Sequence, residues 1–303
     1  MSMYDIIIIG GGPAGLTAAV YARRAFKSVL VLEAKSCGGQ IINTPDIENY
    51  PTWEHISGFD FATRLTEQAK ILGTEIKLER ATDIKTDGEI KTVFTPHGSY
   101  TARAVIIATG SAPRKLGLPN ENELIGRGVS YCATCDGNFF RKKKVAVVGG
   151  GNTALEDALY LSDIANTVYL IHRRDEFRGE TSTVQKLKER ENVSFVLNSS
   201  VTALNAEKGL KSIEVTSNSG AASTIEVSGL FVAVGRIPET RSFAAVAELD
   251  DIGYAASDEN CRTKTPGIFV AGDNRQKEVR QLVTAAADGA VAAAGAIKYL
   301  SEN

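Results

Sequence analysis

Two stretches decide the fold class of this chain: IIIIGGGPAGLTAA at Ile6–Ala19 and VAVVGGGNTALEDA at Val145–Ala158. Each consists of a short β-branched strand, a glycine-rich turn and a segment with the apolar spacing of a helix. Aligned with Val145 on Ile6, the two stretches form an internal repeat. One such glycine turn is a weak signal, but two at corresponding places of a repeat are a strong one. The sequence therefore predicts an α/β protein with two Rossmann-like dinucleotide-binding domains.

The small residues of each turn stand where a dinucleotide requires them. The first glycine makes the tight turn, the second lets the backbone approach the pyrophosphate, and the third lets the helix pack on the strand. The pyrophosphate then rests on the helix N-terminus, where unpaired N–H groups favour an anion. The candidate contacts are Gly10, Gly12, Pro13, Ala14 and Gly15 in the first stretch, and Gly149, Gly151, Asn152, Thr153 and Ala154 in the second.

The end of the next strand distinguishes the two nucleotides. In the first half it places Glu33, whose carboxylate suits the ribose hydroxyls of FAD or NAD. The corresponding position in the second half is His172, with Arg173, Arg174 and Arg178 close behind it. Guanidinium groups fit the 2′-phosphate of NADPH, which a carboxylate would repel. The alternative for this basic cluster is the solvated start of a helix.

The remaining strands indicate that one domain is inserted into the other. Apolar strands at 103–110 and 229–238 end in glycine turns. Another ends at Gly272 and Asp273, where the aspartate would either contact the ribityl hydroxyls of a flavin or cap the following helix. We predict an FAD domain formed by residues 1–114 and 242–303, with an NADPH domain, 115–241, inserted into it. Both boundaries lie in segments rich in turn residues and charge.

Composition excludes several other classes of protein. The chain has 303 residues and a net charge of −2, which gives no indication of nucleic-acid binding. The first residues lack the features of a signal peptide, and no apolar run is long enough for a membrane span. Four cysteines are too few for a disulfide scaffold, so we expect a protein of the reducing cytoplasm.

The stretch SYCATCDG, Ser130–Gly137, contains two cysteines three residues apart. By itself it is consistent with a redox disulfide, half of a metal site, or two buried thiols. A zinc site would need a second such pair or paired histidines, and the histidines are scattered. No metal is therefore expected. Cys37 and Cys261 lie in separate stretches and are expected to be ordinary thiols.

Eight motifs give the chain a family resemblance. GGGPAG, GGQ, ENYP, ATG, CATCDG, GGGNTA, HRRDEFR and GIFVAGD…RQ…TAA follow one another in an order that strongly resembles the bacterial-type, low-molecular-weight thioredoxin reductases. The resemblance covers essentially the whole chain. It implies an NADPH-dependent thioredoxin-disulfide reductase, a homodimer that binds FAD in the outer domain and NADPH in the inserted one.

The resemblance also implies roles for single residues. Cys132 and Cys135 would form the redox disulfide, with Cys135 against the flavin and Cys132 attacking the disulfide of thioredoxin. Asp136 would protonate the departing thiolate, although it could instead cap the following turn. Further FAD contacts would be Gly39, Gln40, Asn49, Ala108, Thr109, Gly110, Gly272, Asp273, Arg280 and Gln281.

The position of the cysteine pair creates a geometric problem. The pair belongs to the NADPH domain, so nicotinamide and disulfide share one rigid body yet need the same flavin. We therefore expect the inserted domain to rotate between two arrangements.

Four positions depart from the family pattern. Thr52 and Trp53 follow ENYP where glycine and phenylalanine are common, Asn274 replaces an apolar residue, and Ala287 stands where glycine is frequent. None of these changes removes a group that the chemistry needs, so what the resemblance implies about the reaction stands, whereas what it implies about flavin packing and partner preference does not carry over directly. The alternatives are a reductase for a glutaredoxin-like or peroxidase-linked partner, a ferredoxin/NADP-type flavin reductase, and a non-catalytic FAD-binding protein.

Overall fold

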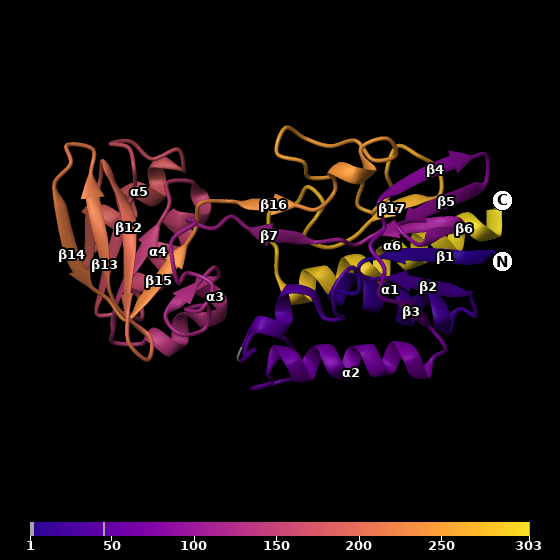
Figure 1. Cartoon of the computed structure of the whole chain (residues 1–303), viewed down its shortest axis with the longest axis horizontal. Coiled ribbons are helices and arrows are strands. Elements are labelled where there is room, and N and C mark those ends of the chain that lie inside the picture. The colour runs from indigo at the N-terminus through magenta and orange to yellow at the C-terminus, as the bar shows by residue number, and fades with distance from the viewer. Residues whose placement is uncertain (1–2, 45, 303) are drawn as a thin grey trace. The chain divides into compact units, whose positions relative to one another are not determined.

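The computed structural model describes residues 3–44 and 46–302. The chain divides into two compact units, of which the second is Pro113–Arg236 and the first comprises the residues on either side of it (Figure 1). The chain passes between the units at β7 (Ser111–Pro113) and β16 (Arg236–Pro238), and these two short strands pair with each other. The inserted unit thus begins and ends slightly before the predicted 115 and 241, so Arg241 belongs to the first unit.

The first unit is built on a seven-stranded sheet of order β3-β2-β1-β6-β5-β4, with β17 added on β6. The strands are β1 (Tyr4–Ile9), β2 (Val29–Leu32), β3 (Glu75–Lys77), β4 (Asp83–Asp87), β5 (Ile90–Thr95), β6 (Gly98–Ile107) and β17 (Ile268–Val270). The long strand β6 pairs antiparallel with β5 near its start and parallel with β1 and β17 near its end. The parallel part is the predicted Rossmann-like sheet.

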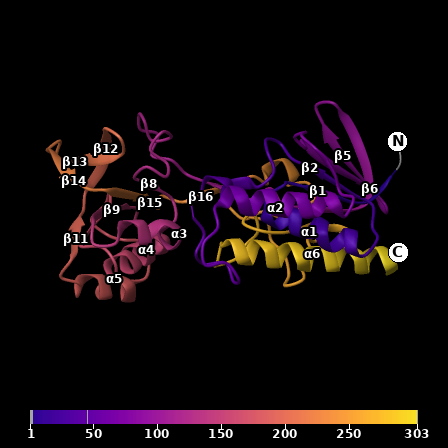
Figure 2. The ribbon, with the colours of Figure 1, turned by 90° about the horizontal axis from the view of Figure 1, so that it is seen from below.

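Helices and short 3-10 turns complete the first unit. They are α1 (Pro13–Arg24), η1 (Gly39–Asn43), α2 (Gly58–Ile71), η3 (Arg241–Phe243) and α6 (Leu282–Glu302). Helix α1 packs against α6 along the sheet (Figure 2). Helix α2 begins where the Ser57 hydroxyl accepts a hydrogen bond from Asp60 N at 3.0 Å, a standard N-cap.

The second unit contains a five-stranded parallel sheet of order β11-β10-β9-β15-β8 and a separate antiparallel sheet, β12-β13-β14. Its strands are β8 (Val129–Ser130), β9 (Lys144–Val148), β10 (Thr167–Ile171), β11 (Val193–Val196), β12 (Ser199–Ala206), β13 (Leu210–Ser217), β14 (Ala222–Glu226) and β15 (Gly229–Val232). Its helices are α3 (Ala133–Asp136), η2 (Gly137–Phe140), α4 (Asn152–Ser162) and α5 (Thr181–Lys188).

The two strands of the internal repeat, β1 and β9, have the same burial pattern. On β1, Ile6 and Ile8 pack with α1, whereas Ile7 and Ile9 face the opposite core. On β9, the aligned residues behave alike, with Val145 and Val147 toward α4. Their neighbours Ala146 and Val148 face the core that includes β12 and β13. Both faces of each strand are buried because the sheet is covered on both sides, which explains the continuous apolar runs in the sequence.

Several element boundaries differ from the predicted ones. The strand expected at 103–110 runs over Gly98–Ile107, and the one expected at 229–238 is divided into β15 and β16. Helix α6 starts at Leu282, well after Asp273, so Asp273 does not cap it. Among the described residues, no helix combines the length and apolar character that crossing a bilayer requires.

Candidate active site

The fingerprint glycines of the first unit divide the roles as the sequence predicts. Gly10 has a φ of +109°, and a Cβ there would collide with the carbonyl oxygen of Ala108. A Cβ on Gly15 would collide with the carbonyl oxygen of Gly10. At Gly12 the nearest atom would lie 3.9 Å away, on Gly39. The first and third glycines are therefore required by backbone packing, and the second leaves open space at the start of α1.

The second unit repeats this division. A Cβ on Gly149, at φ +157°, would collide with the carbonyl oxygen of Ala233. Nothing lies within 4 Å of a Cβ on Gly151. Asn152 and Thr153 follow at the exposed start of α4, and Ala154 is buried beneath the turn. A pyrophosphate could thus approach the backbone at the start of both α1 and α4.

A cavity of about 280 Å³ adjoins the first fingerprint. Glu33 lines it, and its two carboxylate oxygens accept hydrogen bonds from Gly11 N at 2.6 Å and Lys35 N at 2.8 Å. These bonds hold the carboxylate at the end of β2, where a ribose could donate to it. Arg80, Arg241 and Phe243 also line the cavity but are absent from the predicted contacts. No motif in the sequence marks Arg80 or Phe243. Arg241 stands at the predicted end of the inserted domain, so no sequence feature assigns it to the FAD domain.

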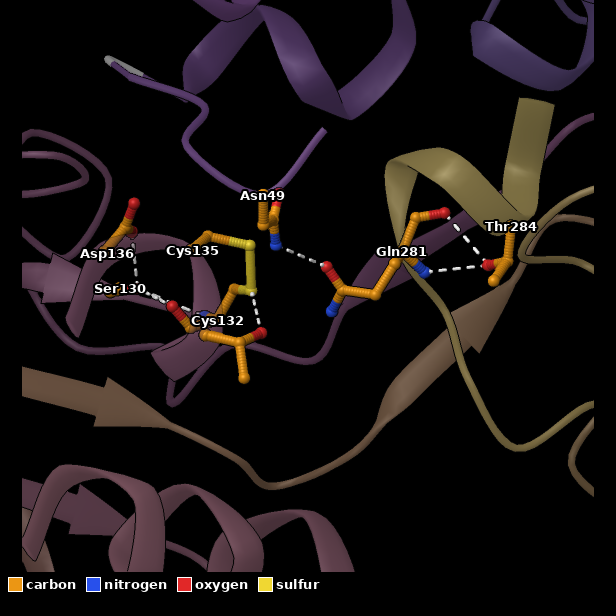
Figure 3. Close-up of a disulfide and its surroundings, with 8 residues drawn as sticks. Asn49, Ser130, Cys132, Cys135, Asp136, Gln281 and Thr284 are labelled. Carbon is orange, nitrogen blue, oxygen red and sulfur yellow. Dashed lines mark hydrogen bonds between the residues drawn. A yellow bond between two sulfur atoms is a disulfide. The ribbon is translucent and has the colours of Figure 1, made fainter. Parts of the chain in front are cut away.

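The other expected FAD contacts lie at the ends of β6 and β17 and in the adjacent turns. Ala108 and Thr109 follow β6, Gly110 precedes β7, and Gly272 and Asp273 follow β17. Gly39 lies beside Gly12 at the start of η1, and Gln40 is the next, exposed residue. Asn49 Nδ2 donates to Gln281 Oε1 at 3.2 Å, which joins two parts of the first unit that are distant in sequence (Figure 3). Arg280 stacks over the ring of Tyr254 at 4.0 Å.

Asn274 is the departure from the family pattern whose environment is clearest. Its side chain is fully buried, and Nδ2 donates to Ile107 O at 2.9 Å and to Thr109 Oγ1 at 3.3 Å. The end of β6 supplies acceptors for the amide protons, whereas Oδ1 is buried and has no hydrogen-bond partner among the described residues. In the second of these bonds Thr109 Oγ1 acts as the acceptor. The hydroxyl proton of Thr109 therefore remains available to another acceptor.

The basic cluster of the second unit separates into two parts. Arg173, Arg174 and Arg178 are exposed, and Arg178 N donates to Gly150 O at 2.7 Å, which ties the cluster to the fingerprint. His172 instead is buried, stacks on Phe177 and bonds through Nε2 to the carbonyl oxygen of Glu176 at 3.1 Å. Burial, together with the nearby arginines, lowers the pKa of His172. The histidine therefore packs as a neutral ring under Gly150, while the guanidinium groups face solvent.

Cys132 and Cys135 form a disulfide, with their Cα atoms 5.3 Å apart (Figure 3). Cys132 stands immediately before α3 and Cys135 lies within it. Both are half-buried, so exposure does not distinguish their roles. Cys37 and Cys261 are unpaired, as predicted. Burial raises the pKa of Cys37, and it raises that of Cys261 to about 12, so both thiols stay protonated near neutrality.

Asp136 lies against the disulfide segment without capping the next turn. It directly precedes η2 but makes no capping hydrogen bond there, so the capping alternative is wrong. Instead, Ser130 Oγ donates to Asp136 Oδ2 at 2.6 Å and accepts from Cys132 N at 3.1 Å. The other carboxyl oxygen, Oδ1, is buried and has no partner among the described residues. Burial raises the pKa of Asp136, which favours a carboxyl group that carries a proton.

One cluster outside these sites was not anticipated. His55 Nδ1 lies 2.7 Å from Asp46 Oδ2, and Glu48 is close to both. The His55 side chain is largely exposed and the two carboxylates are partly exposed, and such acidic surface groups are common without a bound ion.

The family model for pyridine nucleotide-disulphide oxidoreductases matches residues 4–289. Thioredoxin reductase from Listeria innocua is 43% identical over 302 residues, covering 99% of this chain and 95% of that protein. The chain belongs to the thioredoxin reductase family. The solved thioredoxin reductase from Streptococcus pyogenes is 40% identical, covers 99% of both chains and has a TM-score of 0.93. That from Lactococcus lactis, described as the FR conformation, is 39% identical, covers 99% of this chain and 100% of its own, and has a TM-score of 0.70.

Proposed function

We propose that this chain is a thioredoxin-disulfide reductase that uses NADPH and FAD. The observation that carries the proposal is the Cys132–Cys135 disulfide, which lies in the same unit as the second fingerprint and has a buried carboxyl group beside it. Membership of the thioredoxin reductase family supports the choice of partner. The proposed reaction belongs in a reducing compartment such as the cytoplasm, where thioredoxin and its targets cycle through thiols.

The first unit would hold FAD. The open space at Gly12 would receive the pyrophosphate, and Glu33 would accept hydrogen bonds from the adenosine ribose within the adjoining cavity. Arg80, Arg241 and Phe243 extend the candidate lining of the adenosine end. When bound, FAD would supply the two-electron exchange between a nicotinamide and a disulfide.

The second unit would hold NADPH. Gly151 leaves room for the pyrophosphate at the start of α4, and the exposed Arg173, Arg174 and Arg178 would bind the 2′-phosphate. His172 would contribute indirectly, because its buried ring supports the glycine turn from below.

The chain's own residues account for the disulfide chemistry. Two electrons and one proton, the equivalent of the hydride that NADPH would give up, cleave the Cys132–Cys135 bond and leave Cys132 as a thiolate and Cys135 as a thiol. The Cys132 thiolate then attacks the thioredoxin disulfide to form a mixed disulfide. Cys135 gives up its proton and attacks Cys132 Sγ, which restores the internal bond and releases the second thioredoxin sulfur as a thiol that takes up that proton. Asp136 would hold the proton that the departing sulfur takes up, since burial keeps that carboxyl protonated more readily than usual.

The proposal includes rotation of the inserted unit during turnover. Two relatives of nearly equal identity and coverage superpose on this chain with TM-scores of 0.93 and 0.70. Solved members of the family therefore differ as whole molecules, as expected if the same two units occur in different arrangements.

A homodimer is also part of the proposal. Tyr21, Phe26 and Ile71 are exposed apolar residues of the first unit. Near them the ends of α1 and α2 are joined by a bond from Arg23 Nε to Leu72 O at 2.8 Å. Exposed apolar residues gathered in one place are typical of protein–protein contacts. A solution mass of twice that of the chain is the expected measurement.

The decisive experiment compares wild type with Cys132→Ser and Cys135→Ser in NADPH oxidation coupled to thioredoxin. Wild type should reduce thioredoxin, and both variants should lose at least 1,000-fold in turnover, on the order of the loss when a nucleophile is removed. Cys261→Ser is the matched control and should retain activity, because that cysteine is a buried, unpaired thiol of the first unit, whereas the disulfide belongs to the second. Thioredoxin reduction by both Cys132→Ser and Cys135→Ser would overturn the proposal.

The same assay tests the choice of nucleotide. NADH should support far slower turnover than NADPH, because only NADPH offers a phosphate to the arginine cluster. Equal rates with the two nucleotides would contradict the assignment of Arg173, Arg174 and Arg178.

A further inference from the structure

Asp288 of α6 is a buried carboxylate that no step above uses. Only 7% of its surface is exposed. Its Oδ2 accepts hydrogen bonds from Gly272 N at 3.0 Å, Arg275 Nε at 2.9 Å and Lys277 Nζ at 2.9 Å. Its Oδ1 accepts a bond from Arg275 Nη2 at 3.1 Å. One carboxylate thus binds two cations and a backbone amide.

All of these donors lie between Gly272 and Lys277, in the segment that joins β17 to α6. The segment contains no helix or extended strand. Its backbone is held by a bridge between Arg275 and Ala255, and its side-chain contacts supply further anchors. The side chains of Arg275 and Lys277 are themselves only 13% and 9% exposed. Buried ion pairs of this kind add little net stability compared with apolar packing, although breaking one is costly. Their best-supported use is to specify one conformation.

The network extends from this carboxylate to the expected FAD contacts nearby. Asp273 directly follows Gly272, whose amide is held by Asp288. Arg280 Nη2 donates to Arg275 O at 3.4 Å. Lys277 Nζ also donates to Thr284 Oγ1 at 3.3 Å, and that oxygen accepts from Gln281 N at 3.1 Å (Figure 3).

We propose that Asp288 is a positioning residue for FAD, which holds Asp273, Arg280 and Gln281 in their binding geometry without touching the cofactor. The inference rests on the proposed FAD site of the first unit. Burial alone would raise the pKa of Asp288, but bonds from Arg275 and Lys277 outweigh it and hold the pKa below its ordinary value. The carboxylate therefore stays ionised throughout the neutral range, and the segment stays fixed.

The test measures FAD affinity instead of turnover. Holoprotein is diluted in steps, and released FAD is followed by its recovered fluorescence to obtain the dissociation constant. Asp288→Asn keeps the shape of the side chain but removes the charge, and its dissociation constant should rise about tenfold or more, the equivalent of one charge-assisted hydrogen bond. Lys277→Met keeps the Arg275 contact and should give a smaller rise.

Glu302→Gln is the matched control, an acid-to-amide change at the exposed end of the same helix. It should bind FAD as wild type does. Thermal unfolding of the apoproteins distinguishes a role in FAD positioning from a role in stability alone. A role in stability alone would lower the Tm of Asp288→Asn without changing the FAD affinity of the folded protein.

A folded Asp288→Asn protein with a dissociation constant within twofold of wild type would overturn the inference. If that variant does not fold, Lys277→Met decides, and wild-type affinity there would overturn the inference as well. A wild type that binds no FAD would also overturn it. Wild type that retains FAD but does not reduce thioredoxin would instead refute the proposed function and leave the role of Asp288 standing.

Discussion

Two carboxyl groups of the second unit, Asp136 and Asp157, show how burial changes the chemistry of single residues near the disulfide. Burial raises the pKa of both. For Asp157 on α4, burial and the charge of Glu156 together raise it to about 7, although a hydrogen bond from the backbone of Ala133 opposes the shift. Because Ala133 follows Cys132, Asp157 links α4 to the first residue of the disulfide-bearing helix.

The stability of the second unit should therefore depend on pH through Asp157. Between about pH 4 and 7 the folded protein retains a proton on this carboxyl that the unfolded chain has lost, so the free energy of unfolding falls as pH rises. Asp157→Asn should remove this dependence. Relative to wild type it should gain at most about 3 kcal/mol between pH 5 and pH 8, because the proton difference ends near the folded pKa of about 7 and each of the roughly two pH units below it corresponds to about 1.4 kcal/mol.

Urea unfolding at the two pH values checks this expectation. Asp163→Asn, at the exposed C-terminal end of α4, controls for the loss of a charge from the same helix. If Asp157→Asn and wild type lose stability equally as pH rises, the protonated form of Asp157 is not present in the folded protein.

At the scale of elements, the segment before β8 is more ordered than its composition suggests. Its charge and turn residues indicate a linker, yet Glu121 is only 2% exposed. The carboxylate accepts hydrogen bonds from the backbone N–H groups of Leu116, Gly117 and Leu118 at 3.0, 2.8 and 3.3 Å, respectively. It also accepts one from the hydroxyl of Tyr131 at 2.7 Å, and burial together with this bond raises the pKa of Tyr131. Glu121 therefore fixes both this segment and the residue before Cys132.

Glu121→Gln should destabilise the protein by roughly 2–3 kcal/mol, because its amide NH₂ cannot accept the backbone N–H groups that one carboxylate oxygen now satisfies. Tyr131→Phe should cost about 1 kcal/mol, the net worth of one hydrogen bond. Urea unfolding is the measurement, and exposed Glu123→Gln is the matched control. Equal stability of the Glu121 and Glu123 variants would show that the buried bonds contribute nothing.

At the scale of the whole molecule, the chain consists of two units joined by two connections, so the proposed rearrangement is a movement of one unit relative to the other. The proposed cycle requires the second unit to present nicotinamide and disulfide to the flavin in turn. A covalent cross-link between the units should therefore allow one half-reaction and block the other, so that steady-state turnover falls by at least about tenfold.

Separate measurements of flavin reduction by NADPH and of thioredoxin reduction check this prediction. The control carries the same cross-linker with both ends attached within the first unit. A protein that is fully joined between units and still turns over at the uncross-linked rate would show that no rearrangement is needed.

Several features of this protein were determined by its sequence alone. The paired fingerprints were predicted because each depends on residues close together in the chain, and the insertion followed from the order of the two fingerprints and the later strands. The glycine positions are one example, since the turn they form is made by the same few residues. The Cys132–Cys135 disulfide was predicted only through the family resemblance, since spacing alone left three interpretations open. Strand ends were less accurate, since β6 and β17 take their limits from their partners.

Only the tertiary structure decided the environments of single side chains. His172 was expected with the arginines but is buried, and Asp136 contacts Ser130 instead of capping a turn. No motif in the sequence around Glu121 or Asp288 indicated that their carboxylates are buried and hydrogen-bonded. Whether a charged residue is solvated or buried among donors depends on segments that meet only in the folded chain, and burial and those donors determine its pKa and its use.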